Sequence, residues 1–214
     1  KRMVDEFFPE EFDAWAERYD ESVRPDTGFP FGGYSRVLAA VVQAAGVGQG
    51  AAVLDLGTGT GNLAELLMRR GCRLWGLDFS GEMLARARAK LPGAVFAQAD
   101  VRGPWPQEFE RRYDAIVSGY TLHHFPLEEK VRLCRRYLAQ YLKVGGRLVI
   151  GDLAFENAAA EDALRQAMGP EWEQEYFWLA DESLAALRAA GLDAHYTQIS
   201  SCAGVFTVQL HQLA

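Results

Sequence analysis

Long basic runs are absent from this sequence. Lys and Arg never stand more than two in a row, as at Arg111–Arg112 and Arg135–Arg136, and the formal net charge of the 214 residues is −7. A phosphate backbone is bound by a concentrated basic face. We therefore expect no nucleic acid among the partners of this protein.

Cysteine is also scarce, and no apolar run is long. Cys72, Cys134 and Cys202 are far apart, form no CxxC pair and, being odd in number, cannot all pair within the chain. We expect free thiols in a reducing compartment, and hence a cytoplasmic protein. No apolar stretch approaches the roughly 18 residues of a membrane-spanning helix, and no secretory signal is recognisable. Neither membrane insertion nor secretion is expected.

The sequence does contain a regular alternation of strand-like and helix-like segments. The strand-like runs are short, rich in Val, Ile, Leu and Phe, and bounded by Gly, Asp or Pro. They cover residues 52–56, 73–78, 94–98, 114–118 and 147–153. Helical spacing lies between and after them, at about 63–71, 80–90, 131–144 and 181–191, with Ser80 and Asp181 as expected N-caps. This alternation predicts an α/β fold with a doubly wound parallel sheet and helices on both faces.

The end of the chain breaks the alternation. Two strand-like runs, 192–200 and 204–210, are joined by only a few residues, so they can form only a hairpin. The last strand should therefore be antiparallel in a sheet that is otherwise parallel. We expect one domain over residues 1–214, because no linker or repeat is recognisable.

Two further segments lie outside the strand–helix pattern. A helical face near the N-terminus carries Phe12, Trp15, Ala16 and Tyr19, and the stretch at about 156–180 is rich in aromatic residues. In open α/β sheets the ligand site lies beyond the carboxyl ends of the strands. We expect an N-terminal helical lid at about residues 5–34 and an aromatic-rich insertion that walls the pocket, although either set of aromatic rings could simply cover the core.

Residues 53–62 read VLDLGTGTGN, a strand followed by a glycine-rich turn. Glycines there let a ligand approach the backbone, and the next helix offers its N-terminal amides. The dinucleotide spacing G-x-G-x-x-G would need a glycine at position 62, which is Asn62. Asp55, two residues before Gly57, would repel a pyrophosphate and attract an ammonium group. The loop therefore suits a zwitterion better than a dinucleotide.

Acidic residues also end the next two strands. Asp78 is placed to accept hydrogen bonds from a ribose diol, although it could instead cap the following helix. Asp100, with the Val101 N–H beside it, is suited to an exocyclic amine. Three acids at the ends of successive strands indicate a nucleoside site.

The motifs VLDLGTGTGN, GLDFS, AQAD, YDAIVSGYTLHHF and GGRLVIGDL, in this order and spacing, resemble the class I S-adenosylmethionine (SAM) dependent methyltransferases. The resemblance covers about residues 10–210. FDAWAERYDES and SGYTLHHF resemble most closely a small bacterial group of SAM-dependent methyltransferases. The resemblance implies a Rossmann-like seven-stranded sheet in the order 3-2-1-4-5-7-6 with the last strand antiparallel. It also implies SAM as cofactor and S-adenosylhomocysteine as product.

The resemblance assigns the cofactor-binding residues by position. Those at the methionine moiety, where Asp55 would hold the ammonium group, are Asp55, Gly57, Thr58 and Gly59. Those at the ribose and the adenine are Asp78, Phe79, Asp100 and Val101. Ser118 and Gly119 would pass beside the sulfonium, and Tyr19 and Tyr34 would close over the cofactor.

Methyl transfer is an in-line displacement in which alignment is the main task, and a general base helps when the acceptor must lose a proton. The candidate catalytic residues follow strands four and five: His123, His124 and Asp152, with Tyr120 nearby. The two histidines could equally serve packing or hydrogen bonding, and Asp152 could be a pocket wall. We expect no metal, because adjacent side chains should diverge and no carboxylate partner stands at a usual spacing.

The expected function is methyl transfer from SAM to a small-molecule acceptor whose identity the sequence does not give. One alternative is a SAM-sensing protein without turnover, against which the aromatic insertion argues, because a sensor needs no acceptor lid. Another is a nicotinamide-dependent oxidoreductase, which Asn62 disfavours. The oligomeric state leaves no signal in the sequence.

Overall fold

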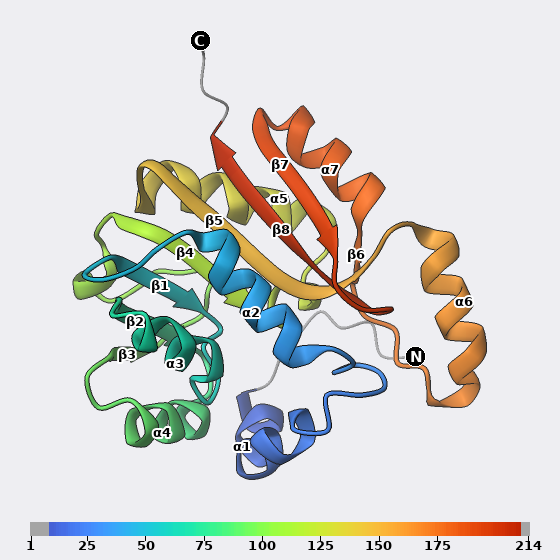
Figure 1. Cartoon of the computed structure of the whole chain (residues 1–214), viewed down its shortest axis with the longest axis horizontal. Helices are drawn as coiled ribbons and strands as arrows, with labels where there is room; N and C mark the ends of the chain where they lie inside the picture. Colours follow the sequence, from blue (N-terminus) through green and yellow to red (C-terminus); the bar gives the residue numbers. More distant parts are fainter. Residues whose placement is uncertain (1–8, 211–214) are drawn as a thin grey trace.

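The computed structural model describes residues 9–210 and consists of one twisted sheet with helices on both faces (Figure 1). The expected lid therefore lies partly outside the described residues, at positions 5–8. The strands are β1 (Ala52–Leu56), β2 (Arg73–Asp78), β3 (Val95–Gln98), β4 (Tyr113–Gly119), β5 (Leu142–Phe155), β6 (Trp178–Leu179), β7 (Leu192–Gln198) and β8 (Ala203–Leu210).

The strand order confirms the predicted topology. The order is β3-β2-β1-β4-β5-β8-β7, with β1 to β5 parallel and β8 antiparallel to both of its neighbours. Without β6 this is the expected 3-2-1-4-5-7-6. The two-residue β6, which the sequence did not suggest, pairs with the end of β5 through Ala154 and Trp178. The parallel strands therefore end at one common edge of the sheet.

The helices and helical turns fill the connections between strands. The helices are α1 (Pro9–Val23), α2 (Tyr34–Ala45), α3 (Asn62–Arg69), α4 (Gly81–Lys90), α5 (Leu127–Arg136), α6 (Ala158–Met168) and α7 (Ala180–Ala189). The shorter turns are η1 (Gln107–Phe109), η2 (Leu122–His124), η3 (Tyr137–Tyr141) and η4 (Gly169–Glu171). None of the helices within residues 9–210 combines the length and apolarity that crossing a membrane requires.

Alternating side chains of the buried strands build two separate cores. On β1, Val53 packs in the cluster that contains α2 and α3, whereas Leu54 and Leu56 pack in the cluster that contains α5 and α7. All five residues of this strand are buried, as expected for a central parallel strand covered on both faces. Figure 1 shows α1 at the edge of the sheet beside α4, which it contacts.

The fold departs from the sequence expectations at one end of two helices. The helical pattern predicted to run to Gly145 ends as a π-turn at Tyr137–Tyr141, and β5 begins directly at Leu142. Ser80 caps α4 as predicted, accepting from the Met83 N–H at 3.1 Å. Asp181 does not cap α7, because that helix already begins at Ala180 with Leu179 at the N-cap.

The helix α2 is the element that the strand–helix alternation overlooked. Its buried residues recur at helical spacing, and Gly46 ends it in the left-handed conformation at φ 63°. They are Tyr34, Val37, Leu38, Val41, Val42 and Ala45. This helix covers the centre of the sheet over β4, β5 and β8, and it brings Tyr34 to the edge where the strands end.

Candidate active site

The glycine loop follows β1 and has the backbone that only glycine adopts without strain. Gly57, Gly59 and Gly61 have φ of 68°, 54° and 85°. A Cβ atom on Gly57 would collide with the side chain of Thr121, whereas a Cβ atom on Gly59 would meet no atom within 4 Å. Gly57 is therefore required by packing against the protein, and Gly59 leaves a cradle beside the loop.

Asp55 lies beneath this loop and is only 1% exposed. Its Oδ2 accepts a hydrogen bond from Thr58 Oγ1 at 2.7 Å, but its Oδ1 is buried with no hydrogen-bond partner among residues 9–210. Burial raises the pKa of Asp55 to about 7, with the nearby Asp78 adding to the effect and the Thr58 hydrogen bond opposing it. A buried carboxylate oxygen without a donor is the feature that an ammonium group would satisfy.

Asp78 ties the glycine loop to the next strand–helix junction. Its Oδ2 accepts from the Gly59 N–H at 2.8 Å and its Oδ1 from the Ser80 N–H at 2.9 Å. Burial raises its pKa to about 6 against the effect of these hydrogen bonds. A carboxylate has about four lone-pair sites, so Asp78 keeps the capacity to accept from a diol. Its contact with the ribose stays a prediction.

The third acid is arranged differently. Asp100 forms a bidentate ion pair with Arg102, whose Nη2 lies 2.6 Å from Asp100 Oδ2. The backbone carbonyl groups beside it accept hydrogen bonds from buried side chains. Trp105 Nε1 donates to the Asp100 carbonyl at 3.1 Å, and the Tyr137 hydroxyl donates to the Val101 carbonyl at 3.0 Å. The backbone at the expected adenine position is therefore well fixed. The Asp100 carboxylate would have to share its oxygens between Arg102 and an adenine amine.

The N-terminal helix is fastened over the loop by Asp20, which sequence reasoning missed. Asp20 accepts from Thr60 Oγ1 at 2.6 Å and from Asn62 Nδ2 at 3.1 Å, and it pairs with Lys90 at 3.1 Å. Asn62, the residue that excluded the dinucleotide spacing, also bonds the Tyr34 hydroxyl at 3.2 Å. Asn62 thus connects α1, α2 and α4. An isolated Asp on an amphipathic helix carries no sequence signal of this role.

Aromatic residues link the N-terminal segment to the end of β4. The rings of Tyr34 and Tyr120 are 5.1 Å apart, and Phe31 packs against Tyr19, Tyr34 and Tyr120. Tyr120 has φ 51°, unusual for a residue with a side chain, and its buried hydroxyl finds no partner within the described part of the chain. Backbone strain of this kind gathers at functional sites. Burial raises the pKa of Tyr19 well above its usual value.

Ser118 and Gly119 occupy the end of β4. The Ser118 side chain is fully buried and donates to Leu56 O at 2.9 Å, so its hydroxyl joins β4 to β1. An added Cβ atom at Gly119 would lie 3.4 Å from Leu38. Any contact of these two residues with a cofactor would therefore be through the backbone, and that contact stays a prediction.

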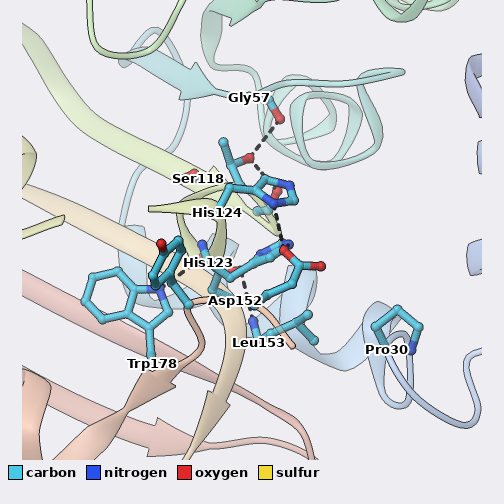
Figure 2. A network of polar contacts seen from close by, with 12 residues as sticks. Pro30, Gly57, Ser118, His123, His124, Asp152, Leu153 and Trp178 are labelled. Atoms are coloured by element: carbon cyan, nitrogen blue, oxygen red, sulfur yellow. Dashed lines mark hydrogen bonds and ion pairs between the residues drawn. The ribbon is translucent and has the colours of Figure 1, made fainter. Parts of the chain in front are cut away.

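His123 and Asp152 form a buried pair in which three backbone or indole groups hold the carboxylate. His123 Nδ1 lies 2.5 Å from Asp152 Oδ1, and the His123 N–H donates to Asp152 Oδ2 at 2.9 Å. The Leu153 N–H and Trp178 Nε1 donate to the same carboxylate at 2.9 and 3.1 Å. Figure 2 shows Asp152 and Trp178 on one side of the His123 ring and His124 on the other.

The electrostatics of this pair follow from its burial. Burial alone would lower the pKa of His123 and raise that of Asp152, but their mutual attraction and hydrogen bond outweigh it. The pKa of His123 is raised and the pKa of Asp152 is lowered as a result. The sequence placed both residues among the catalytic candidates, and the structure brings them into direct contact. Their catalytic role stays a prediction.

His124 turns toward the insertion, where it meets Glu175. His124 Nδ1 lies 2.8 Å from Glu175 Oε2, and His123 Nε2 lies 3.6 Å from the same oxygen. The two imidazole rings are 4.0 Å apart at 48°. The expectation that the adjacent histidine side chains diverge is therefore wrong, and both lie near one carboxylate. The partner was invisible in the sequence because it lies 51 positions away.

A buried lysine completes this side of the site. Lys130 of α5 is 1% exposed, donates to the Tyr176 carbonyl and lies 4.4 Å from the centre of the Trp178 ring. Burial lowers its pKa to about 8, opposed by the charge of Asp152. The aromatic insertion is thus anchored through Tyr176 and Trp178. Two other rings of the insertion, Trp172 and Phe177, pack against Phe29 with ring centres 5.2 and 5.9 Å away.

Comparisons with known proteins agree with this geometry. Residues 53–146 match the family model of a methyltransferase domain. A protein of Geobacillus kaustophilus named as an uncharacterized methyltransferase is 34% identical, over 87% of this chain and 89% of that protein. The uncharacterized methyltransferase YrrT of Bacillus subtilis is also 34% identical, over 84% of this chain and 81% of its own length.

Solved structures share this fold. The DhpI-SAM-HEP complex aligns with a TM-score of 0.71 at 24% identity, covering 94% of both chains. Magnesium protoporphyrin IX methyltransferase (ChlM) of Synechocystis, with bound SAH, aligns with a TM-score of 0.74 at 19% identity over 94% of this chain and 97% of that chain. The fold is shared at these identities.

The chain belongs to the methyltransferase family. Two features of its own site fit SAM as the cofactor: Asp55 Oδ1, which has no partner among residues 9–210, and the cradle beside Gly59. Both lie where a methionine moiety, with its ammonium group, would meet the loop.

Proposed function

We propose that this enzyme transfers the methyl group of SAM to a small-molecule acceptor at the edge where the parallel strands end. The observation that carries the proposal is Asp55, whose buried Oδ1 has no donor among residues 9–210 and points to a cationic ligand. A net charge of −7 and the absence of a basic run support a small acceptor over a nucleic acid.

The proposed cofactor contacts follow the order of the strands. Asp55 holds the ammonium group, and Gly57, Thr58 and Gly59 carry the methionine backbone. The residues proposed at the ribose, the adenine and the sulfonium are Asp78, Phe79, Asp100, Val101, Ser118 and Gly119. Tyr19 and Tyr34 cover the cofactor from α1 and α2, held there by Asp20 and Asn62.

When bound, SAM supplies an electrophilic methyl group on a sulfonium sulfur. The chain's own residues have to align the acceptor and exclude water, and this alignment can lower the barrier by about 7–11 kcal/mol. The aromatic rings around Tyr34 and Tyr120 exclude water from the side of the N-terminal segment. We propose that His123, His124 and Asp152 face the acceptor and assist removal of its proton.

Asp152 prepares His123 for this task. Its oxygens are satisfied by Leu153 and Trp178, so it stays in place and fixes the proton of His123 on Nδ1. The Nε2 atom of His123 then carries the lone pair and faces Glu175 at 3.6 Å. An acceptor hydroxyl, amine or thiol would meet the site at this nitrogen.

Calorimetric titration with S-adenosylhomocysteine tests the cofactor assignment. Asp55→Asn keeps the shape of the side chain and removes its charge, so the affinity should fall by about 10–150-fold, the equivalent of a lost charged hydrogen bond. Asp114→Asn is the matched control, because Asp114 pairs with Lys143 at the start of β4 and should leave the affinity unchanged. Unchanged affinity in Asp55→Asn would remove Asp55 from the site.

Label transfer tests the reaction itself. Protein incubated with methyl-labelled SAM and a small-molecule extract should release labelled product of low molecular mass. Label recovered only on macromolecules would contradict a small-molecule acceptor.

A further inference from the structure

Three side chains that commonly bind metal ions converge beside the acceptor side of the site. They are His123 and His124 of η2 and Glu175 of the insertion, and their candidate ligand atoms all lie within 4.8 Å of one another. Glu175 Oε2 lies 2.8 Å from His124 Nδ1 and 3.6 Å from His123 Nε2. These separations are close to those between neighbouring ligands of a four-coordinate ion with bonds of about 2.0–2.1 Å.

His123 has the second partner that metal-binding histidines typically have. Asp152 lies 2.5 Å from His123 Nδ1, and therefore holds the ring so that Nε2 is directed toward Glu175. A carboxylate behind a histidine fixes its tautomer and raises its basicity as a ligand. Asp152 is itself held by the Leu153 N–H and by Trp178 Nε1.

The position of Glu175 is fixed by the residues that follow it. Lys130 donates to the carbonyl of Tyr176, and Trp178 pairs with Ala154 in the sheet. The Glu175 side chain is 28% exposed, whereas those of His123 and His124 are 7% and 18% exposed. One side of the cluster is thus enclosed, and Glu175 lies on the side that a ligand can reach.

The charges around the cluster favour a cation. Asp152 and Glu175 contribute two carboxylates, which lie 2.5 Å from His123 Nδ1 and 2.8 Å from His124 Nδ1. Lys130 is the buried cation on this side, and it is directed to the Tyr176 carbonyl and the Trp178 ring. The two carboxylates and Lys130 together leave one negative charge, which favours a cation between the histidines and Glu175.

We propose that His123, His124 and Glu175 bind a divalent transition-metal ion that coordinates the oxygen of a hydroxyl acceptor. The inference rests on the proposed function of the same site. Two imidazoles and one carboxylate suit Zn²⁺, Co²⁺, Ni²⁺ or Fe²⁺ better than Mg²⁺ or Ca²⁺. Three protein ligands leave coordination positions open, as in catalytic metal sites.

Such an ion would make a hydroxyl a better methyl acceptor. Coordination lowers the pKa of a bound O–H group. With the ion bound, His123 Nε2 is a ligand and not a base, so the proton leaves to solvent. An oxygen lone pair then forms a bond to the methyl carbon while the carbon–sulfur bond breaks and its electron pair stays on sulfur. The products are a methyl ether, S-adenosylhomocysteine and one proton, so no oxidant or reductant is needed.

Titration with Co²⁺ alone tests the site without any acceptor. Chelator-treated full-length protein should bind one Co²⁺ and develop visible absorption bands typical of mixed nitrogen and oxygen ligands. Glu175→Gln and His124→Gln should abolish these bands, and Asp152→Asn should weaken binding by roughly 10–100-fold, as for the loss of a second partner of a ligand histidine. Glu173→Gln, an exposed acid of the same segment, is the matched control and should change nothing.

The same samples should be titrated with S-adenosylhomocysteine to show that they are folded and bind the cofactor. Binding of S-adenosylhomocysteine without stoichiometric Co²⁺ would overturn the metal proposal and leave the proposed function standing. Co²⁺ bands that persist in both Glu175→Gln and His124→Gln would place the ion elsewhere and overturn it equally. Loss of S-adenosylhomocysteine binding in the wild type would instead contradict the proposed function.

Discussion

The two sides of the site are built in different ways. The proposed cofactor side consists of the ends of β1, β2 and β3 with the glycine loop, and nearly all of its pieces lie within 50 residues of one another. The proposed acceptor side consists of η2, Asp152, Lys130 and the segment 169–179, and its contacts join positions 26 to 51 residues apart. The first combines the backbone shape of the glycine loop with the buried carboxylates of Asp55 and Asp78, and the second consists of buried side chains of both charges.

This difference has a physical consequence. Backbone amides and glycines form a cradle whose energy depends on local conformation, so it holds its shape when a distant side chain changes. A cluster of buried charges is stable only while every member is paired, because an unpaired charge in the interior is costly. We expect substitutions on the acceptor side to lower stability more than cofactor affinity. We expect substitutions on the cofactor side to lower cofactor affinity more than stability.

The strongest test of this contrast is Asp152→Asn on the acceptor side. It removes the charge that His123 and Trp178 depend on, and breaking a buried pair of this kind costs about 3–5 kcal/mol. Chemical denaturation should show this loss, while the affinity for S-adenosylhomocysteine stays within about twofold. A tenfold loss of that affinity would break the distinction between the two sides.

The pH dependence of that stability loss follows from the pKa shifts. The raised pKa of His123 contributes stability that is fully present below its unfolded pKa of about 6.5 and is lost as pH rises through the folded pKa. The lowered pKa of Asp152 contributes stability that is present above about 3.9 and is lost as pH falls through the folded pKa. The difference between wild type and Asp152→Asn should therefore be largest between about pH 4 and 6.5.

On the cofactor side, Gly57→Ala and Gly59→Ala form a matched pair. Both glycines have positive φ, but only the new methyl group at position 57 would collide, with Thr121. Gly57→Ala should lower the free energy of unfolding by about 2–4 kcal/mol, and Gly59→Ala by only about 1 kcal/mol. Gly59→Ala should nevertheless weaken S-adenosylhomocysteine binding tenfold or more, which denaturation and calorimetry together would show. Unchanged binding in Gly59→Ala would remove that cradle from the cofactor site.

The charge state of Asp55 should make cofactor binding depend on pH. Its pKa, raised to about 7, means that the free protein is partly protonated near neutrality, whereas an ammonium group binds the ionised form. Affinity for S-adenosylhomocysteine should rise by up to about tenfold per pH unit between pH 6 and 7 and then level off. In Asp55→Asn the affinity should rise less with pH, because only Asp78, with its pKa of about 6, still contributes to the pH dependence.

The smallest effect is expected for the contacts that Asp20 of α1 makes with the glycine loop. Asp20→Ala removes the contacts to Thr60, Asn62 and Lys90, and a partly exposed ion pair contributes only about 0.2–1 kcal/mol. Stability should change little, while S-adenosylhomocysteine should dissociate several-fold faster in stopped-flow measurements. Asp162→Ala, which removes an exposed ion pair on α6, is the control and should leave dissociation unchanged.

The alternation of strands and helices, the terminal hairpin and the Ser80 cap were predictable because each depends on local pattern, whereas the order of the strands was expected from the family resemblance. Period-two and helical spacing are properties of a few neighbouring residues. The end of α5 and the start of α7 were not predicted correctly, because tertiary contacts set them against the apparent helical pattern. The helix α2 carried a readable spacing that the alternation of strands and helices obscured.

The sequence by itself determined the features from which the cofactor side is proposed: VLDLGTGTGN, Asp55 and Asp78, each at the end of a strand-like run of an α/β pattern. A glycine turn and an acid at a strand end can be recognised from a few neighbouring residues, since their chemistry is local. Only the tertiary structure decided the acceptor side, where Glu175 and Lys130 join His123 and His124. Those residues come from an insertion and a helix whose packing has no short-range signature. Their role depends on burial, which exists only once the chain has folded.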